Sequence, residues 1–474
     1  MSRRYRAGWI GLLGAMLGAC SDMVRPEIPA GTLRSTAAAA EDDDRPDEAE
    51  MLAFARRLPA LGGYHFTRDG DLVVSLTDAA QAHGANAMLA GVARRGSGRM
   101  HVRPARYSFL QLREWRDAIA EPLMGVAGVT MLDLDEVANQ VVVGVAEPGA
   151  RPAVLELGRR LGIPVPALAF VEGGYPEVMS LEVYAPYTST TPVQGDSITS
   201  YRRPLEGGLQ ISYRRGVHPD SATKCTLGFT ALWNGQRVGV TASHCSLRQW
   251  DPDGVGYFQS LPGAARYVGY ELLDPNAKSC GFLSINVCRN SDGMLMHLEA
   301  DVPDNFGYIA RPVGPPRSGV SPYGVLVSSL RIDAANPRFR IVAQRAPKGD
   351  DVVHKVGVTS GWTSGLMLRT CSDMPADRSY SWLRCQSLAE MSATTGDSGA
   401  PVFIDHGDGT VTLVGLLWGI KTENGVRYAA FSSVPQLEKD LGVLQSFPGS
   451  GSGGGGGGGG EPGTGPGCDP FCIY

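Results

Sequence analysis

The sequence contains no apolar run that reaches the length of a membrane-spanning helix. Such a helix needs about 20 residues, and the only candidate is the short stretch 7–19. Cysteines spaced Cys-x-x-Cys are absent, as is the segment His-Glu-x-x-His, so a zinc ribbon, a thioredoxin-type motif and the commonest metalloprotease signature are excluded. The formal net charge is −5 over 474 residues. The chain therefore lacks the strong basicity that is typical of nucleic-acid-binding proteins. We expect no metal, no cofactor and no nucleic-acid partner.

Glycine and apolar residues, in contrast, are plentiful. The chain has 62 glycines among 474 residues, nearly twice the usual share of about 7%, and 43% hydrophobic against 19% charged residues. This composition can bury sizeable cores and predicts many strands, turns and linkers, so an all-helical protein and a largely disordered one are both excluded. The length suits two or three domains.

The N-terminus has the pattern of an export signal. Three arginines precede the apolar stretch, which ends in Leu17-Gly18-Ala19-Cys20, and a basic region, an apolar region and small residues in this order are typical of a cleaved leader. The ending also resembles the bacterial lipobox, in which the cysteine receives a lipid and becomes the first residue of the mature protein. We therefore expect a lipoprotein signal peptide at 1–19 and a lipid anchor on Cys20. An ordinary secretory signal is the alternative.

The remaining cysteines fit an exported protein. Removing Cys20 from the nine cysteines leaves eight, an even number in an oxidising compartment, where disulfides persist. The sequence alone allows many connectivities. Pairing of neighbours along the chain would close four short loops: Cys225–Cys245, Cys280–Cys288, Cys371–Cys385 and Cys468–Cys472.

The composition changes several times along the chain. Residues 20–50 are rich in alanine and acidic residues and are expected to form a solvated tether. Residues 51–185 mix short β-type runs with helical patterns, which predicts a compact α+β module. A linker rich in serine, threonine and proline follows at 186–205.

Local signals inside the module predict individual elements. Asp69-Gly70 between two β-rich runs indicates a hairpin. A helix is expected over 78–90, with Gly91 placed to stop it. Ser108 is the expected cap of a further helix, with Gln111 as its capping-box partner. The remaining patterns predict strands at 129–134 and 140–145, a helix at 153–161 and a strand near 165–171.

The second half of the chain is predicted to be a β domain. Residues 206–446 contain many short β-type runs broken by Gly, Pro, Asn and Asp, which is typical of an all-β sandwich or barrel. Only 435–441 forms a convincing helical pattern, with a proline suited to its first turn. The Gly/Pro-rich segment 447–467 is expected to be a flexible spacer before a tail, 468–474, that holds two cysteines.

Two short segments carry the residue types that acyl transfer needs. His244 follows the apolar run 240–242, and Ser398 lies in the segment Gly396-Asp397-Ser398-Gly399. A hydroxyl becomes a strong nucleophile when an imidazole takes its proton, and two backbone N–H groups must meet the developing oxyanion. We expect Gly396 and Ser398 to supply those N–H groups, because glycine lets the backbone approach without a Cβ atom.

A carboxylate is needed to orient the imidazole. Asp292 is the expected residue, because it leads directly into the apolar strand pattern 293–296. Asp301 and Asp304 on the same segment are the alternatives. The expected triad is therefore His244, Asp292 and Ser398.

These segments, in the order His, Asp, Ser, resemble the chymotrypsin-like serine peptidases, and more closely their secreted bacterial branch, the streptogrisin and α-lytic protease group. The resemblance extends over about residues 64–443. It implies a two-barrel protease domain and a disulfide between Cys225 and Cys245. It also implies that residues 64–171 are similar to a pro-domain, which in the family assists folding of the protease and is then removed.

The resemblance assigns roles to further residues. Lys355 stands where the bacterial branch has an arginine, and it is expected to pair with Asp397; a solvated lysine on a strand is the alternative. Ser392, Trp418 and Gly419 stand in the segments that form the substrate pocket. Without an acidic residue at 392, a trypsin-like preference for Arg or Lys is disfavoured, and Gly419 would leave the pocket open to large side chains.

The sequence departs from the family pattern at three positions. Leu417 stands where the family usually has a serine whose hydroxyl supports the catalytic aspartate, so the support of Asp292 is in doubt. His354 and Ser364 stand at positions that are cysteines in the family, so that disulfide is absent.

The sequence as a whole predicts an exported, lipid-anchored serine endopeptidase. Its expected fold is an all-β two-barrel chymotrypsin-like protease domain preceded by an α+β pro-domain-like module, and its expected state is a monomer acting on a polypeptide substrate. The resemblance to bacterial lipoproteins implies that Ser21, directly after the expected lipidated cysteine, favours transport to the outer membrane, with a periplasmic location as the alternative. The alternative is a non-catalytic or self-inhibited surface lipoprotein that uses the fold for binding or regulation.

Overall fold

The computed structural model describes residues 46–449 except 68, 179–180, 189, 215–219, 282–284, 322–323, 350 and 377–379. The predicted signal peptide, Cys20, most of the tether and of the spacer, and the tail with Cys468 and Cys472 lie outside the described residues. Within the described part, no helix is both long enough and apolar enough to cross a membrane.

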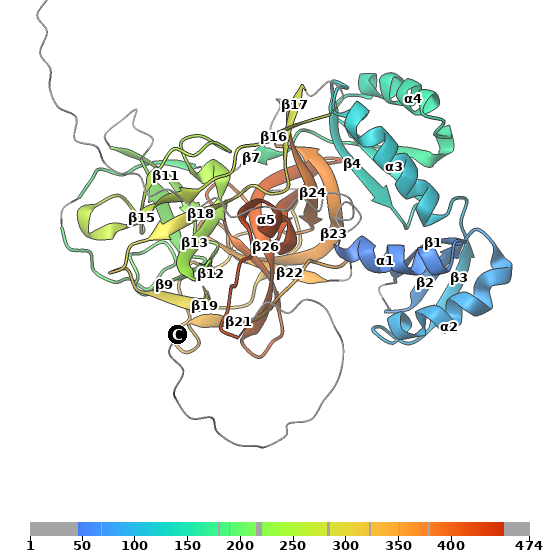
Figure 1. Ribbon diagram of the computed structural model, residues 1–474. Helices are drawn as coiled ribbons and strands as arrows, with labels where there is room; N and C mark the ends of the chain where they lie inside the picture. Colours follow the sequence, from blue (N-terminus) through green and yellow to red (C-terminus); the bar gives the residue numbers. More distant parts are fainter. Residues whose placement is uncertain are drawn as a thin grey trace, which may run out of the picture. The chain divides into compact units, whose positions relative to one another are not determined.

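The N-terminal module has two small α+β layers (Figure 1). In the first, strands follow the order β1-β2-β3; in the second, β4 and β5 are antiparallel and β5 and β6 parallel. The elements of the first layer are α1 (Pro46–Arg57), β1 (Leu61–Phe66), β2 (Leu72–Leu76), α2 (Ala82–Ala93) and β3 (Met100–Pro104). Those of the second are α3 (Phe109–Leu123), β4 (Val129–Asp135), β5 (Gln140–Val145), α4 (Arg151–Arg160) and β6 (Leu168–Glu172).

Local hydrogen bonds explain where several of these elements begin. The predicted hairpin is present, because β1 and β2 pair antiparallel and Gly70 turns between them at φ +78°. The predicted capping box is also present: Ser108 Oγ accepts from the Gln111 N–H, and the Gln111 side chain accepts from the Ser108 N–H.

The predicted bounds of the helix between β2 and β3 are wrong. Asp78 caps a short 3-10 turn, with its carboxylate accepting from the Ala80 N–H, and the α-helix begins only at Ala82. The helix then continues through Gly91 to Ala93. Glycine inside a helix costs about 1 kcal/mol, and burial of Val92 and Ala93 in the core offsets this cost.

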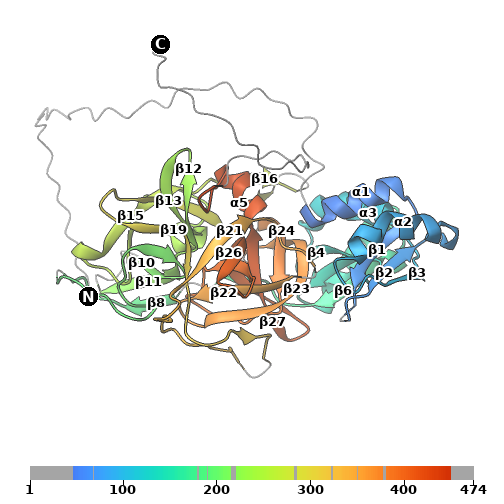
Figure 2. The same ribbon diagram turned by 90° about the horizontal axis from the view of Figure 1, so that it is seen from below.

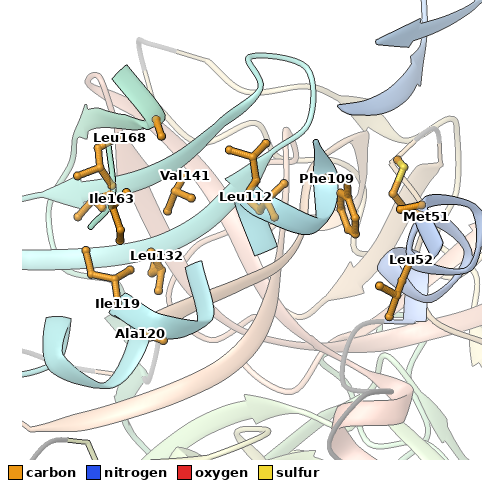
Figure 3. Close-up of a cluster of buried hydrophobic side chains, with 14 of the residues drawn as sticks. Met51, Leu52, Phe109, Leu112, Ile119, Ala120, Leu132, Val141, Ile163 and Leu168 are labelled. Carbon is orange, nitrogen blue, oxygen red and sulfur yellow. The ribbon is translucent and has the colours of Figure 1, made fainter. Parts of the chain in front are cut away.

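The module has one apolar core that crosses both layers. Figure 3 shows side chains of α1, α3 and the β4–β6 layer in this core. The cluster also includes Trp382, which lies on a strand of the second half of the chain. The module therefore shares part of its core with the β domain.

The β domain contains two closed barrels, which lie side by side in Figure 1 and in Figure 2. In the first barrel each strand pairs antiparallel with the next, and β11 runs into β12 through 227–228 to close the ring. Its strands are β10 (Gln210–Tyr213), β11 (Ser221–Thr226), β12 (Phe229–Trp233), β13 (Gln236–Ala242), β14 (Gly256–Phe258), β15 (Tyr267–Leu273) and β18 (Gly293–Leu298).

The second barrel closes through antiparallel pairs in the order β22-β23-β24-β27-β26-β25 and back to β22. Its strands are β22 (Val352–Gly357), β23 (Gly361–Pro375), β24 (Ser381–Ala389), β25 (Pro401–Asp405), β26 (Thr410–Glu423) and β27 (Val426–Ser433). The remaining elements are β7 (Glu177–Val178), β8 (Leu181–Tyr184), β9 (Leu205–Gly207), β16 (Lys278–Cys280), β17 (Asn286–Arg289), β19 (Asp304–Ala310), β20 (Arg317–Ser318), β21 (Arg338–Gln344) and α5 (Val434–Leu441). The fold is thus mostly β, with two barrels as expected from the sequence.

Part of the predicted linker packs onto the barrels. Ile198 is fully buried in an apolar cluster with residues of both barrels. Its N–H donates to the Leu330 carbonyl, and its own carbonyl accepts from the Gln210 N–H. This segment was expected to be a linker because its composition is polar, but a single buried isoleucine and two backbone hydrogen bonds fix it to the domain.

Three disulfides are present among the described residues. They join Cys225 to Cys245, Cys280 to Cys288, and Cys371 to Cys385. The first ties β11 to the turn that carries His244.

Candidate active site

His244 is held on a short helical turn at the end of a buried strand. The apolar strand β13 pairs on both edges, with β12 and β18, and the chain then forms the 3-10 turn Ser243–Cys245. The Ser243 N–H donates to the Asp292 carbonyl over 2.8 Å. Together with the disulfide at Cys245, this bond restricts the movement of the imidazole.

The imidazole of His244 contacts both of the other predicted triad residues. Its Nε2 lies 2.7 Å from Ser398 Oγ, and its Nδ1 is hydrogen-bonded to Asp292 Oδ2. All three side chains are buried. In this arrangement an imidazole can take the hydroxyl proton while the carboxylate holds the ring in the required tautomer.

The two alternative aspartates lie elsewhere. Asp304 Oδ2 lies 3.9 Å from Arg237 Nη1, and Asp301 is exposed. The structure therefore brings Asp292, and neither alternative, into contact with His244.

The carboxylate of Asp292 is fully buried and is held by side chains that the sequence did not indicate. Its Oδ1 accepts from Trp250 Nε1 over 3.0 Å and from Gln249 Nε2 over 2.8 Å. Its backbone N–H donates to Ser432 Oγ over 3.1 Å. Leu417, where the family has a supporting serine, is buried among apolar side chains. Gln249 and Trp250 lie a few residues after the histidine and carry side-chain donors. The local sequence does not indicate that these donors contact an aspartate about 40 residues away.

The turn that carries Ser398 depends on glycine. Gly396 has φ +93°, and a Cβ at this position would lie 2.5 Å from Thr359 Oγ1. Thr226 fixes the turn from the other barrel: its Oγ1 donates to the Gly396 carbonyl over 3.0 Å, and its N–H donates to the Ser398 carbonyl over 2.8 Å. The turn that carries Ser398 is therefore positioned by both barrels.

Asp397 is buried beneath this turn and is surrounded by donors. Lys355 Nζ lies 3.3 Å from Asp397 Oδ2, and both side chains are fully buried. The carboxylate also accepts from the hydroxyl and the N–H of Ser360 and from the N–H groups of Thr359 and Thr394. Burial lowers the pKa of Lys355 below its usual value, and the charge of Asp397 opposes this.

The predicted substrate-pocket residues lie on the second barrel. Ser392 is buried, and its Oγ accepts from the Leu326 N–H over 2.9 Å. Trp418 is fully buried, and its Nε1 donates to Gln386 Oε1 over 2.8 Å. Trp418 shares an apolar cluster with Met131 of the N-terminal module, so the module covers it.

The segment after the module lies against the same region. Strand β7 pairs antiparallel with β26, placing Val178 opposite Gly419. Strand β8 pairs antiparallel with β11, placing Leu181 opposite Lys224. A Cβ built on Gly396 would have Lys224 Cε at 3.0 Å and Leu181 Cδ2 at 3.5 Å. The chain's own strands therefore occupy strand edges on both barrels next to the turn that carries Ser398.

The described residues contain no cluster of three or more His, Cys, Asp or Glu side chains suited to a metal ion. The triad and its supporting groups are ordinary side chains and backbone groups. The arrangement places a hydroxyl, an imidazole and a carboxylate in the order that nucleophilic catalysis needs.

No family model and no curated protein matches this chain. Among solved structures, a Nocardiopsis protease matches at 15% identity and a TM-score of 0.34, covering 51% of this chain and 98% of that one. A chymotrypsin of Cellulomonas bogoriensis matches at 16% identity and a TM-score of 0.33, and an α-lytic protease homologue at 15% and 0.33, each with the same coverage. The chain resembles chymotrypsin-like serine proteases. At these identities and TM-scores the matches carry no conclusion about the activity of this chain.

Proposed function

We propose that the protein is a serine endopeptidase that cleaves peptide bonds through an acyl-enzyme. The contact that carries this proposal is that of His244, whose two ring nitrogens meet Ser398 and Asp292. A surface protein that reused the fold for binding alone would not need a buried imidazole between a hydroxyl and a carboxylate.

The steps follow from this geometry. Ser398 Oγ attacks the carbonyl carbon while His244 Nε2 takes its proton, and the N–H groups of Gly396 and Ser398 bind the oxyanion. The intermediate collapses as His244 returns the proton to the leaving amine, which gives the acyl-enzyme. Water then attacks the ester, giving its proton to His244, and the acid product and free Ser398 are released.

The surroundings of the triad support a pocket for uncharged side chains. Ser392 brings no negative charge, so an Arg or Lys side chain of a substrate would find no partner there. Gly419 adds no side chain, so the pocket stays open to large groups. The substrate is a polypeptide, and its sequence preference is expected to be apolar at this position.

The intact chain is best described as a self-inhibited form of this enzyme. The pairing of β7 with β26 and of β8 with β11 takes strand edges beside Ser398 that an extended peptide would otherwise use. Removal of the N-terminal module and of β7, as in the family's pro-domains, would free the edge at Gly419. The lipid on Cys20 and export to the cell envelope complete the proposal, and the disulfides suit such a compartment.

The decisive test is covalent labelling of Ser398 by a fluorophosphonate. We expect a single phosphonyl adduct on Ser398, slow in the intact chain and faster after limited proteolysis, and no adduct in Ser398→Ala. Asp292→Asn should fold normally and lower peptide turnover by about 10⁴-fold, the size of the effect for the same change in a chymotrypsin-type triad. If neither the intact nor the processed chain is labelled, the protein is not a serine peptidase.

A further inference from the structure

The buried carboxylate of Asp292 needs donors that the family's usual serine cannot supply here. Asp292 is fully buried, and an unpaired charge in that position would be strongly destabilising. Leu417 has no hydroxyl and packs with apolar neighbours. The support must come from another part of the chain.

The two oxygens of Asp292 have different partners. Oδ2 faces His244, whereas Oδ1 accepts from the indole of Trp250 and the amide of Gln249. With Oδ1 occupied by two donors, rotation of the carboxylate about Cβ–Cγ would break both bonds. These donors therefore hold Oδ2 toward the imidazole.

The backbone of Trp250 is arranged for this contact. Trp250 has φ +62°, a left-handed conformation that is unfavourable for a residue with a large side chain. Its N–H donates to Ser243 Oγ over 2.9 Å and to Asp274 Oδ2 over 3.0 Å, and its carbonyl accepts from Asn276 Nδ2 over 3.1 Å. Side chains thus fix both the N–H and the carbonyl of Trp250, and its indole N–H donates to Asp292.

We propose that Trp250 is a positioning residue of the triad, which holds the carboxylate of Asp292 in place of the missing serine hydroxyl, with Gln249 as a second donor. The role in turnover rests on the proposed peptidase function. The positioning itself concerns the His244–Asp292 contact, which is observable without a substrate.

The charged groups around these residues come from several elements. Arg248 and Asp251, which flank Gln249 and Trp250 in the chain, pair with each other over 2.8 Å. Arg289 Nη1 lies 2.7 Å from Asp274 Oδ1, and its guanidinium carbon lies 5.9 Å from the centre of a Trp250 ring. Burial raises the pKa of Asp274 to about 6, and Arg289 opposes that rise. Asp440 in turn lies 3.4 Å from Arg289 Nε. Replacing Trp250 by phenylalanine removes one donor from Asp292 and changes none of these charges.

The test uses Trp250→Phe in the full chain, which keeps an aromatic ring and loses the N–H. We expect Ser398 to react with a fluorophosphonate about tenfold to a hundredfold more slowly, the size expected for losing one hydrogen bond to a charged group. Oδ1 then carries more negative charge beside the imidazole, so imidazolium is favoured and the acid side of the pH–rate profile moves to higher pH. After processing, kcat falls and KM stays nearly constant.

Proton NMR gives a readout that needs no activity. The proton in the His244–Asp292 hydrogen bond is expected far downfield in the wild-type protein and shifted or broadened in Trp250→Phe. Trp233→Phe is the matched control, because Trp233 Nε1 donates to the Leu441 carbonyl over 2.7 Å, away from the triad. This control should lose a similar amount of stability and leave the resonance and the pH–rate profile unchanged.

The outcomes separate the inference from the proposed function. If Trp250→Phe keeps the wild-type resonance, labelling rate and pH–rate profile, the positioning role is wrong. Should Trp250→Phe not fold, Gln249→Leu removes the second donor and must show the same changes, or the inference fails. A wild-type protein that is never labelled, yet whose downfield resonance responds to Trp250→Phe, would overturn the peptidase proposal and leave the positioning role standing.

Discussion

At the scale of single residues, the turn of Gly396 and Ser398 lies against a buried charge pair. Asp397 is fixed by backbone donors, by Ser360 and by Lys355, whose ammonium also contacts Ser360 Oγ and the Gly361 carbonyl. A carboxylate left alone in this position would cost several kcal/mol. The lysine therefore supports the geometry of Gly396 and Ser398 from within the same barrel, without a free terminal amine.

Replacing this lysine tests that support. Lys355→Met should lower the unfolding free energy by about 3–5 kcal/mol, because it leaves the charge of Asp397 buried without the lysine ammonium beside it. It should also lower kcat and change KM much less. Lys355→Arg should preserve both. Denaturant unfolding and steady-state kinetics measure the two effects, and wild-type turnover in Lys355→Met would show that the pair is not needed.

A second buried carboxylate links stability to pH. Glu271 on β15 accepts from the N–H groups of Asp253 and Gly254 through Oε2. Burial, together with the nearby Asp253, raises its pKa from 4.5 to about 7. A raised pKa means that folding favours the protonated form, so this stabilisation is complete below 4.5 and is lost as the pH rises through about 7.

The corresponding variant is Glu271→Gln, which mimics the protonated side chain. We expect the wild-type unfolding free energy to fall across this pH window and the fall to be smaller in Glu271→Gln. Urea unfolding on both sides of the window measures the difference. If the unfolding free energy changes with pH equally in the two proteins, Glu271 is ionised in the folded state throughout this pH window.

At the scale of elements, the strands after the module are the most consequential. β7 and β8 are short, yet both pair with strands beside the catalytic turn. The segment between β8 and the first barrel also packs onto the domain, because Ile198 is buried in an apolar cluster with residues of both barrels. The same segment therefore connects the module to the barrels and covers the strand edges that the proposed function assigns to a peptide substrate.

Weakening β7 should expose the site. Val178→Pro removes a backbone donor and disfavours pairing with β26, so labelling of Ser398 in the intact chain should become faster. Val193→Pro is the control, because Val193 is exposed and lies outside the strands. If Val178→Pro is labelled at the wild-type rate, β7 does not limit access to Ser398.

At the scale of the whole molecule, charged side chains join the module to the second barrel. Arg369 on β23 pairs with Asp133 of β4 and with Glu423 of β26, and Arg116 of α3 pairs with Asp373 of β23. These pairs are largely buried, so each partner depends on the others for charge balance. The module and the second barrel are therefore coupled electrostatically as well as through the shared core.

The location of the molecule is tested at the N-terminus. Cys20→Ala should move the protein from the membrane fraction to the soluble periplasm or the medium, because a lipid-modified cysteine would be its only anchor; a single chain binds only marginally, so more than one acyl group is expected. Fractionation and mass spectrometry of the N-terminal peptide measure this. An unchanged membrane location would contradict the lipoprotein prediction.

The sequence alone determined what depends on near neighbours. The hairpin at Gly70, the capping box at Ser108 and the bounds of β5 rest on bonds between residues close in the chain, so composition and spacing predicted them. The histidine and serine segments were recognisable for the same reason. The family resemblance that these short, ordered segments carry predicted the two-barrel fold, and the roles of the triad residues stay a prediction.

Only the tertiary structure decided how those residues are held. Trp250 meets Asp292 across 42 residues, and Thr226 reaches Gly396 across 170. Such contacts exist only after the barrels close, and the left-handed backbone of Trp250 depends on Ser243 and Asp274 being already in place. The position of β7 against β26 likewise depends on the packing of the module, because a two-residue strand has no local signal of its own.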